Sequence, residues 1–417
     1  MTGPRDFQGS GVEEILETLG LTRENSGPGF RDALFARFNE RVPFETASKI
    51  LRNAEGLEEA ERPRRPDRFW TDHLEWGAGG TCFARVAAFE ALFLELGFEC
   101  RKVLGRVEAD FDHAALLLQK GGQDWLYDVG FPLPAPVALS DGEIETDFFP
   151  LRVSRSDRGF RVELAGGVPE GPRALEILDR PVSDEEFEQV WRRTFLPGSR
   201  FLKGVSLRRQ LEGRVVSFSG GELRIDDRHS RTRIPLLGSR PEALEERFGV
   251  EAARLARAFA LVGDPPPRIS QAEMSVYLET NVSAEEAFQA IVPPKGYGRL
   301  MEGIGEVEAE ADGEGWRVRV SARGTTDQTT AGLEERVARD PVGRRLRVRR
   351  GGAVSFYAAE SHAGRTYLVR QAILDGARED LLRNDSLRGR LAGPLALDLL
   401  AWARMLAGGP ESSVEGT

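Results

Sequence analysis

Residues 77–83 read GAGGTCF, and apolar residues at helical spacing follow them, among them Phe89, Leu92 and Leu96. Glycines directly before a helical pattern place Cys82 at the helix N-terminus, where unpaired N–H groups and the helix dipole favour a thiolate over a thiol. The same amides can stabilise an oxyanion on an acyl group that the sulfur attacks. Cys82 is therefore a candidate nucleophile, although a small buried residue at a helix start has the same pattern.

A second stretch supplies a candidate base and a candidate carboxylate. Residues 111–118 read FDHAALLL, which puts His113 at the start of an apolar strand, and residues 125–130 read WLYDVG, which suit the partner strand. A two-glycine turn between them would bring His113 and Asp128 to the same end of a hairpin. A carboxylate beside an imidazole fixes its tautomer and supports the imidazolium that forms. Together with Cys82 they make a nucleophile, a base and an orienting group.

Composition limits the classes of function. With 57 basic and 67 acidic side chains the net charge is −10, which disfavours nucleic acid as a partner. No apolar run reaches the roughly 18–20 residues that span a bilayer, and the first residues lack a signal peptide, so we expect a cytoplasmic protein. Two cysteines exclude a disulfide scaffold, and the four histidines lack metal-ligand spacing, so no metal is expected.

The chain divides at residues 263–268, GDPPPR, because consecutive prolines continue neither a helix nor a central strand. We expect an α+β multidomain protein with a first domain at 1–262, a proline-rich linker at 263–270 and a second domain at 271–417. Hydrophobic spacing predicts helices over 10–98, strands over 100–164, helices starting at the capping serines Ser183 and Ser283, one helix over 241–261 and a long helix over 381–406.

Several motifs of the first domain, in this order, resemble those of the arylamine N-acetyltransferases. The resemblance covers about residues 8–262, and its carriers are VPFET at 42–46, GGTCF at 79–83, the pair Asp112-His113, YDVGF at 127–131, PGSRF at 197–201, RIPLL at 233–237 and FGV at 248–250. It implies a helical bundle, a β-barrel and an α/β lid with a transglutaminase-like triad of Cys82, His113 and Asp128. It further implies transfer of an acetyl or other acyl group from acyl-CoA, through a Cys82 thioester, to an arylamine- or hydrazine-type acceptor, with Phe44 and Phe131 at the substrate.

The sequence departs from the family pattern at four positions. Ala78 stands where the family usually has Arg, Ala84 where it has an acidic or amide residue, Pro132 where it has Gly, and Thr46 where it has Asn. The triad is unaffected, but the acyl donor and the arylamine preference are left open. The alternatives are an amide synthase or transglutaminase-like amidase with another acyl donor, and a ligand-binding protein with an unused triad.

Residues 271–408 resemble the START-like, or polyketide-cyclase-like (SRPBCC), superfamily. The carriers are MSVYL at 274–278, SAEEAF at 283–288 and the terminal helix. The resemblance implies a helix-grip α+β fold with a cavity for a hydrophobic ligand under the long helix. No nucleophile–base pair is evident in this part of the sequence.

Overall fold

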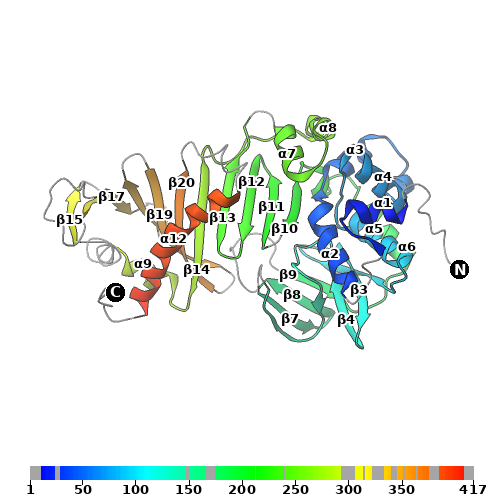
Figure 1. The fold of residues 1–417 in the computed structure, drawn as a ribbon, viewed down its shortest axis with the longest axis horizontal. Helices are drawn as coiled ribbons and strands as arrows, with labels where there is room; N and C mark the ends of the chain where they lie inside the picture. The colour runs from blue at the N-terminus through cyan, green and yellow to red at the C-terminus, as the bar shows by residue number, and fades with distance from the viewer. Residues whose placement is uncertain are drawn as a thin grey trace. The chain divides into compact units, whose positions relative to one another are not determined.

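Two units make up the computed structural model of the 417-residue chain (Figure 1). The first comprises Met1–Arg228 and Leu236–Arg268, and the second comprises His229–Pro235 and Ile269–Thr417. The structure describes residues 11–23, 29–146, 150–164, 174–211, 213–237, 240–292, 306–312, 315–321, 333–339, 345–350, 353–362, 365–374 and 385–407.

The proline-rich segment is anchored on the first unit. The Arg240 guanidinium donates to the Pro265 carbonyl oxygen at 2.8 Å, and the Arg268 amide donates to Glu222 Oε1 at 2.8 Å. These bonds hold both ends of the segment against the body of the unit. The division into 1–262, 263–270 and 271–417 stays a prediction, while the contacts assign residues 229–235, from before the prolines, to the second unit.

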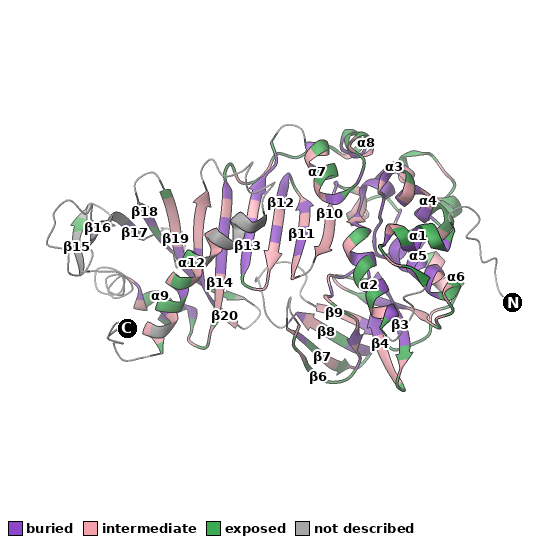
Figure 2. Cartoon of the chain, in the orientation of Figure 1, coloured by how far each residue is buried: buried purple, intermediate pink, exposed green. Residues whose placement is uncertain are grey.

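The first unit begins with helices whose apolar faces pack together. They are α1 (Val12–Thr18), α2 (Phe30–Arg41), α3 (Ala47–Ala54), α4 (Pro66–Trp76) and α5 (Cys82–Glu95). Aromatic rings fill the space between them: the Phe38 ring centroid lies 4.7 Å from that of Phe89 and 5.8 Å from that of Trp70. Most of α5 is buried (Figure 2), so this helix lies inside the helical part and presents Cys82 at its first turn.

An antiparallel sheet follows the helices. Its strand order is β5-β4-β3-β2-β9-β8-β7-β6. Gly121 and Gly122 connect β3 to β4 with φ of +62° and +78°, the left-handed conformation that a tight two-residue hairpin needs. The hairpin predicted from the sequence is therefore present. The strand bounds are β2 (Arg101–Arg106), β3 (Asp110–Lys120), β4 (Gln123–Tyr127), β5 (Val137–Ala138), β6 (Gly142–Ile144), β7 (Leu151–Ser156), β8 (Gly159–Leu164) and β9 (Ala174–Leu178).

A second sheet and short helices complete the first unit. Strand β1 (Phe44–Glu45) pairs with β10 (Leu207–Leu211), which continues to β11 (Arg214–Ser219) and β12 (Glu222–Asp227). Helix α6 (Asp184–Arg193) begins at the predicted cap, where the Ser183 hydroxyl accepts from the Glu186 amide at 3.1 Å. The short 3₁₀ helix η3 (Arg200–Leu202) follows α6.

The single helix predicted over 241–261 is wrong. The structure has two, α7 (Arg240–Phe248) and α8 (Ala252–Val262). Gly249 adopts φ +76°, which ends α7, and the amide of Glu251 donates to the carbonyl of Trp76 at the end of α4. Hydrophobic spacing misses this break because the apolar stripe continues on both sides of it.

The second unit is an antiparallel sheet crossed by a long helix (Figure 1). Helix α12 (Asp385–Leu406) packs on β14 and β20, and Trp402 and Leu399 join Leu368 in a buried apolar cluster. The predicted helix start, residues 381–384, lies outside the described residues; Pro394 lies inside the helix.

The strand order is β13 (Ser230–Pro235), β14 (Ala272–Thr280), β20 (Arg365–Leu374), β19 (Ala353–His362), β18 (Arg345–Arg350), β17 (Leu333–Arg339), β16 (Gly315–Ser321) and β15 (Glu306–Asp312), with α9 (Ala284–Ala290) after β14. Among the described helices none is long and apolar enough to cross a membrane.

Two glycines let the chain pass closely from α4 to α5. A Cβ on Gly77, which has φ +73°, would lie 1.8 Å from the Gly249 carbonyl oxygen. A Cβ on Gly79 would lie 1.6 Å from the Pro43 carbonyl oxygen. Any larger residue would push the backbone apart, so the turn before Cys82 is held by backbone-to-backbone contact.

We predict that Gly79→Ala destabilises the folded chain by at least about 2 kcal/mol, because its Cβ would overlap the Pro43 carbonyl. Gly204→Ala is the matched control, since a Cβ there meets nothing within 4 Å. The control should change the free energy of unfolding by less than about 0.5 kcal/mol. Urea unfolding of both variants measures the difference, and equal midpoints would contradict the close approach.

Candidate active site

Cys82 is the first residue of α5. Its side chain is buried, and its Sγ lies 3.8 Å from the carbonyl oxygen of Asp112. The first intrahelical bond at this end runs from the Arg85 amide to the Thr81 carbonyl, so the amides of Cys82 and Phe83 precede the helical hydrogen-bond ladder. The sulfur therefore lies at the positive end of a helix, as the glycine pattern predicted.

The structure brings His113 and Asp128 together. His113 Nε2 lies 2.7 Å from Asp128 Oδ2, and both side chains are buried. The other oxygen, Asp128 Oδ1, accepts from the amides of Gly130 and Phe131 at 2.8 Å each. The carboxylate is thus held from two sides and fixes the orientation of the imidazole ring.

His113 and Cys82 meet at Gly130. A Cβ on Gly130 would lie 2.6 Å from Cys82 Cβ and 2.8 Å from His113 Cε1. Burial by itself lowers the pKa of His113, but the Asp128 carboxylate and the neighbouring Cys82 sulfur outweigh it, so the pKa is raised above its ordinary value. Because Nε2 faces Asp128, Nδ1 is the nitrogen left for the sulfur.

The backbone before His113 is strained and clamped. Phe111 has φ +62°, which is rare for a residue with a side chain. The Asp112 carboxylate accepts from the amides of Val107, Glu108 and Ala109 at 2.8–2.9 Å. This clamp holds the tight loop that turns the start of β3 toward Cys82.

The expected substrate residues flank this centre. The Phe131 ring lies edge-on to His113, with centroids 6.5 Å apart. Phe44 lies on β1 opposite Arg208 of β10, and it forms an isolated bridge with Gly80. The Phe131 ring therefore lies against the imidazole, and the backbone of Phe44 lies beside the glycine turn.

Arg85 is a buried cation that the sequence analysis missed. It lies one turn into α5 and donates to the carbonyl of Val129 at 2.5 Å and to Asn39 Oδ1 at 2.9 Å, and it also donates to the carbonyl of Val42. Burial, followed by the charge of Arg208, lowers its pKa to about 9. Its signal in the sequence is that it is the only charged residue between Cys82 and Phe89.

The first departure from the family pattern, Ala78, lies in a closely packed turn. Ala78 is buried, and its carbonyl accepts from His73 Nδ1 at 2.9 Å; burial lowers the pKa of His73 to about 4, so the ring is neutral. The buried Arg64 pairs with Asp72 at 3.0 Å and also donates to the carbonyl of Gly79. An arginine from another segment therefore supports the turn that carries Ala78.

Two further departures from the family pattern, Ala84 and Pro132, are accommodated by their immediate neighbours. Ala84 is buried on α5, 3.0 Å from the place of a Cβ on Gly80. Pro132 is the middle residue of a tight turn in which the Leu133 amide donates to the Phe131 carbonyl at 2.8 Å. The fixed φ of proline suits this position, so Pro132 stiffens the segment after Asp128.

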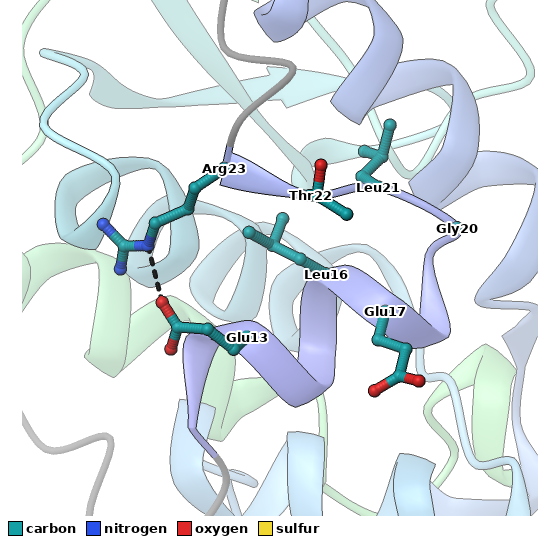
Figure 3. A pocket seen from close by; sticks show the side chains of 7 residues that line it. All are labelled: Glu13, Leu16, Glu17, Gly20, Leu21, Thr22 and Arg23. Carbon is teal, nitrogen blue, oxygen red and sulfur yellow. Dashed lines mark hydrogen bonds and ion pairs between the residues drawn. The ribbon is translucent and has the colours of Figure 1, made fainter.

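A separate surface hollow lies beside α1 (Figure 3). Its walls include Leu16, Gly20 and Leu21, and its rim carries an ion pair between Arg23 and Glu13 at 2.8 Å. None of the triad residues lines it, so it is not the candidate site. Over the described part of the chain, no three His, Cys, Asp or Glu side chains gather as metal ligands.

Comparisons with known proteins identify the family of the chain. Residues 32–256 match the sequence profile of the N-acetyltransferase family. The chain is 28% identical to proansamycin X synthase of Amycolatopsis mediterranei over 138 residues, which are 30% of this chain and 51% of that protein. It is 36% identical to arylamine N-acetyltransferase of Escherichia coli over 78 residues, which are 16% and 28%. It thus spans about half the length, or less, of the curated relatives it matches.

Solved structures share the fold of the first unit. The M. smegmatis arylamine N-acetyltransferase superposes with a TM-score of 0.53 at 22% identity, over 62% of this chain and 99% of that one. The Mycobacterium marinum enzyme in complex with CoA gives 0.50 at 17% identity, over 61% and 100%. The family profile covers more than half of the chain. The chain therefore belongs to the arylamine N-acetyltransferases, a family of acetyltransferase enzymes.

Proposed function

We propose that the chain is an acyltransferase that moves an acetyl or other acyl group from acyl-CoA through a Cys82 thioester to an amine of the arylamine or hydrazine type. The observation that carries the proposal is the 2.7 Å contact of His113 Nε2 with Asp128 Oδ2 beside the buried Cys82. A nucleophile, a base and a group that orients the base are the parts that acyl transfer needs.

The first half-reaction acylates the enzyme. Cys82 Sγ, whose proton has passed to His113 Nδ1, attacks the thioester carbonyl carbon as a thiolate. The bond from that carbon to the CoA sulfur breaks, and CoA leaves as a thiol with the proton from His113. The free amides at the start of α5 suit the negative oxygen of the tetrahedral intermediate.

The second half-reaction releases the amide. The acceptor amine attacks the Cys82 thioester, His113 takes the amine proton, and the bond from carbon to Cys82 Sγ breaks. The sulfur regains the proton, so the enzyme returns to its starting state. Asp128 stabilises the imidazolium in both halves, because its second oxygen is occupied by two backbone amides and cannot turn away.

A different acyl donor is the second candidate. The match to proansamycin X synthase is longer than the match to the Escherichia coli acetyltransferase, and Pro132 stiffens the turn in which the family has glycine. An amide synthase or transglutaminase-like amidase would use the same triad with another donor. A ligand-binding protein with an unused triad would form no acyl adduct.

For the second unit we propose a START-like domain that takes a hydrophobic ligand. Helix α12 across an antiparallel sheet, with Trp402, Leu368 and Phe288 in one buried apolar cluster, supports this proposal. Apolar side chains around a cavity are the physical requirement for such a ligand.

Acylation of Cys82 tests the main proposal. Incubation with a panel of acyl-CoAs, acetyl-CoA included, should add one acyl mass to the wild-type chain and none to Cys82→Ala. Cys100→Ala is the matched control and should keep the adduct, because burial and then Glu90 raise the pKa of Cys100 to about 12. Intact mass spectrometry reads the result, and an adduct that persists in Cys82→Ala would contradict the assignment.

Asp128→Asn should lower the transfer rate on the order of 10²–10⁴-fold while the fold persists. The asparagine oxygen can still accept from Gly130 and Phe131, so its NH₂ would face His113 Nε2 and impose the wrong tautomer. Asp124→Asn, in the same hairpin and bonded to Arg101 at 2.6 Å, is the control and should keep the rate. Near-normal turnover of Asp128→Asn would make the carboxylate structural.

The ligand of the second unit can be tested in the full chain. Organic extraction of the purified protein should release an apolar molecule from the wild type. Ala359→Trp fills space at a buried position of β19 beside the apolar cluster and should abolish the release. Ala353→Trp, at an exposed position of the same strand, should not. Equal release from both variants would show that the ligand lies elsewhere.

A further inference from the structure

Lys49 is a buried lysine close to the candidate active site. It lies on α3 with 5% of its surface exposed, and its Nζ donates to Thr194 Oγ1 at 2.7 Å. The ammonium lies 4.7 Å from the centre of the Phe195 ring and 6.0 Å from that of Phe201. Burial lowers its pKa to about 8, and the charge of Cys82 opposes this shift, so the ammonium form prevails at neutral pH.

This ammonium has no anionic partner among the described residues. A lysine ammonium has three N–H donors, and the hydroxyl of Thr194 takes one of them. A desolvated contact with an aromatic ring is worth about 2 kcal/mol, whereas burying a cation costs several kcal/mol. The surroundings therefore offset the burial of Lys49 only in part.

Arg208, which is half-buried, lies on the other side of an aromatic pair. Its guanidinium donates to the carbonyl of Gly130 and lies 4.7 Å from the centre of the Phe44 ring. The Phe44 and Phe201 rings meet edge to face, with centroids 5.4 Å apart. Lys49 and Arg208 thus each lie over one ring of the pair, and the Arg200 guanidinium also lies 5.5 Å from the centre of the Phe201 ring. No described carboxylate forms an ion pair with Arg208.

Three other cations with little exposure are paired with carboxylates. Arg64 pairs with Asp72 at 3.0 Å, Lys102 with Glu90 at 2.5 Å, and Arg370 with Asp398 at 2.9 Å. Arg85 directs its donors to two carbonyls and an amide oxygen instead. Lys49 and Arg208 form no ion pair with a described carboxylate. The Cys82 sulfur acts electrostatically on both, and Asp128 acts on Arg208 as well.

We propose that Lys49 and Arg208 form a recognition site for a carboxylate carried by the small molecule that reacts at Cys82. The inference rests on the proposed acyl transfer and adds a substrate class to it. Arg208 connects the site to the chemistry, because its partner Gly130 lies directly against Cys82 and His113. The two remaining N–H groups of Lys49 and the guanidinium of Arg208 supply donors for a planar carboxylate.

Charge-selective alkylation of Cys82 tests the site without any acyl donor. Iodoacetate and iodoacetamide alkylate the same thiolate and differ only in a carboxylate against a carboxamide. The rate with iodoacetate divided by the rate with iodoacetamide is therefore independent of the thiolate fraction. Peptide mass mapping gives both rates at Cys82, and 2-mercaptoethanol gives the ratio for a free thiol.

In the wild type we expect a ratio at least tenfold above that of 2-mercaptoethanol. Lys49→Met keeps the length of the side chain and removes its charge, so the ratio should fall at least fivefold. Lys203→Met, an exposed lysine directly after η3, is the matched control and should keep the wild-type ratio. If Lys49→Met does not fold, Arg208→Gln should give the same fall, and Arg208→Lys should restore the preference.

A wild-type ratio equal to that of 2-mercaptoethanol, or an unchanged ratio in the folded variants, would overturn the carboxylate site while the acyl transfer stood. Failure of both reagents to label Cys82 would instead overturn the proposed function, and this site with it. The two failures are thus distinguishable.

The source of the carboxylate is decided by two matched pairs of reactants. Succinyl-CoA against butyryl-CoA tests a carboxylate on the acyl group, and an aromatic amine with a carboxylate against its carboxamide tests the acceptor. The pair whose preference falls at least fivefold in Lys49→Met identifies the source. If neither pair loses its preference in Lys49→Met, the proposal is overturned.

Discussion

A carboxylate that is fully buried, Asp128, is the constraint on which the site depends. A buried anion costs several kcal/mol unless its oxygens are occupied, and here one oxygen faces His113 and the other accepts two backbone amides. Those bonds require the tight turn after β4 and a residue without a side chain at Gly130. Because a Cβ there would strike both Cys82 and His113, the turn that stabilises the anion is also the place where α5 and β3 meet.

Two arginines lie near this anion: Arg85 is buried and Arg208 is half-buried. Arg85 and Arg208 both act electrostatically on Asp128, and each also donates to a carbonyl of the turn, at Val129 and Gly130. The cations thus hold the backbone and balance the charge at once. Arg64 does the same for the glycine turn before Cys82, where the family pattern has an arginine in place of Ala78. At Ala78, Arg64 thus supplies from another segment a charge beside this turn.

The functional proposals for the two units rest on different kinds of evidence. For the first, the profile shows the family and solved structures share the fold. The geometry around Cys82 is the basis of the proposed acyl transfer, with an atom assigned to each step. For the second, the apolar packing of α12 on its sheet is the observation behind the proposed hydrophobic ligand. The strand formed by residues 230–235 belongs to the second unit although it precedes the prolines, so the division of the chain does not follow the proline segment alone.

Sequence by itself determined what depends on neighbours along the chain. The helical stripes, the caps at Ser183 and Ser283, the two-glycine hairpin and the position of Cys82 at a helix start each follow from a few adjacent residues. Three other features do not follow from adjacent residues. They are the helix break at Gly249, the anchoring of the prolines, and the surroundings of Lys49 and Arg208. They arise from contacts between distant residues, such as Lys49 with Thr194 and Arg208 with Gly130, whose meeting no local pattern encodes. Only the packed structure decides whether a lysine such as Lys49 faces water or is buried near Cys82, because burial depends on every element that covers it.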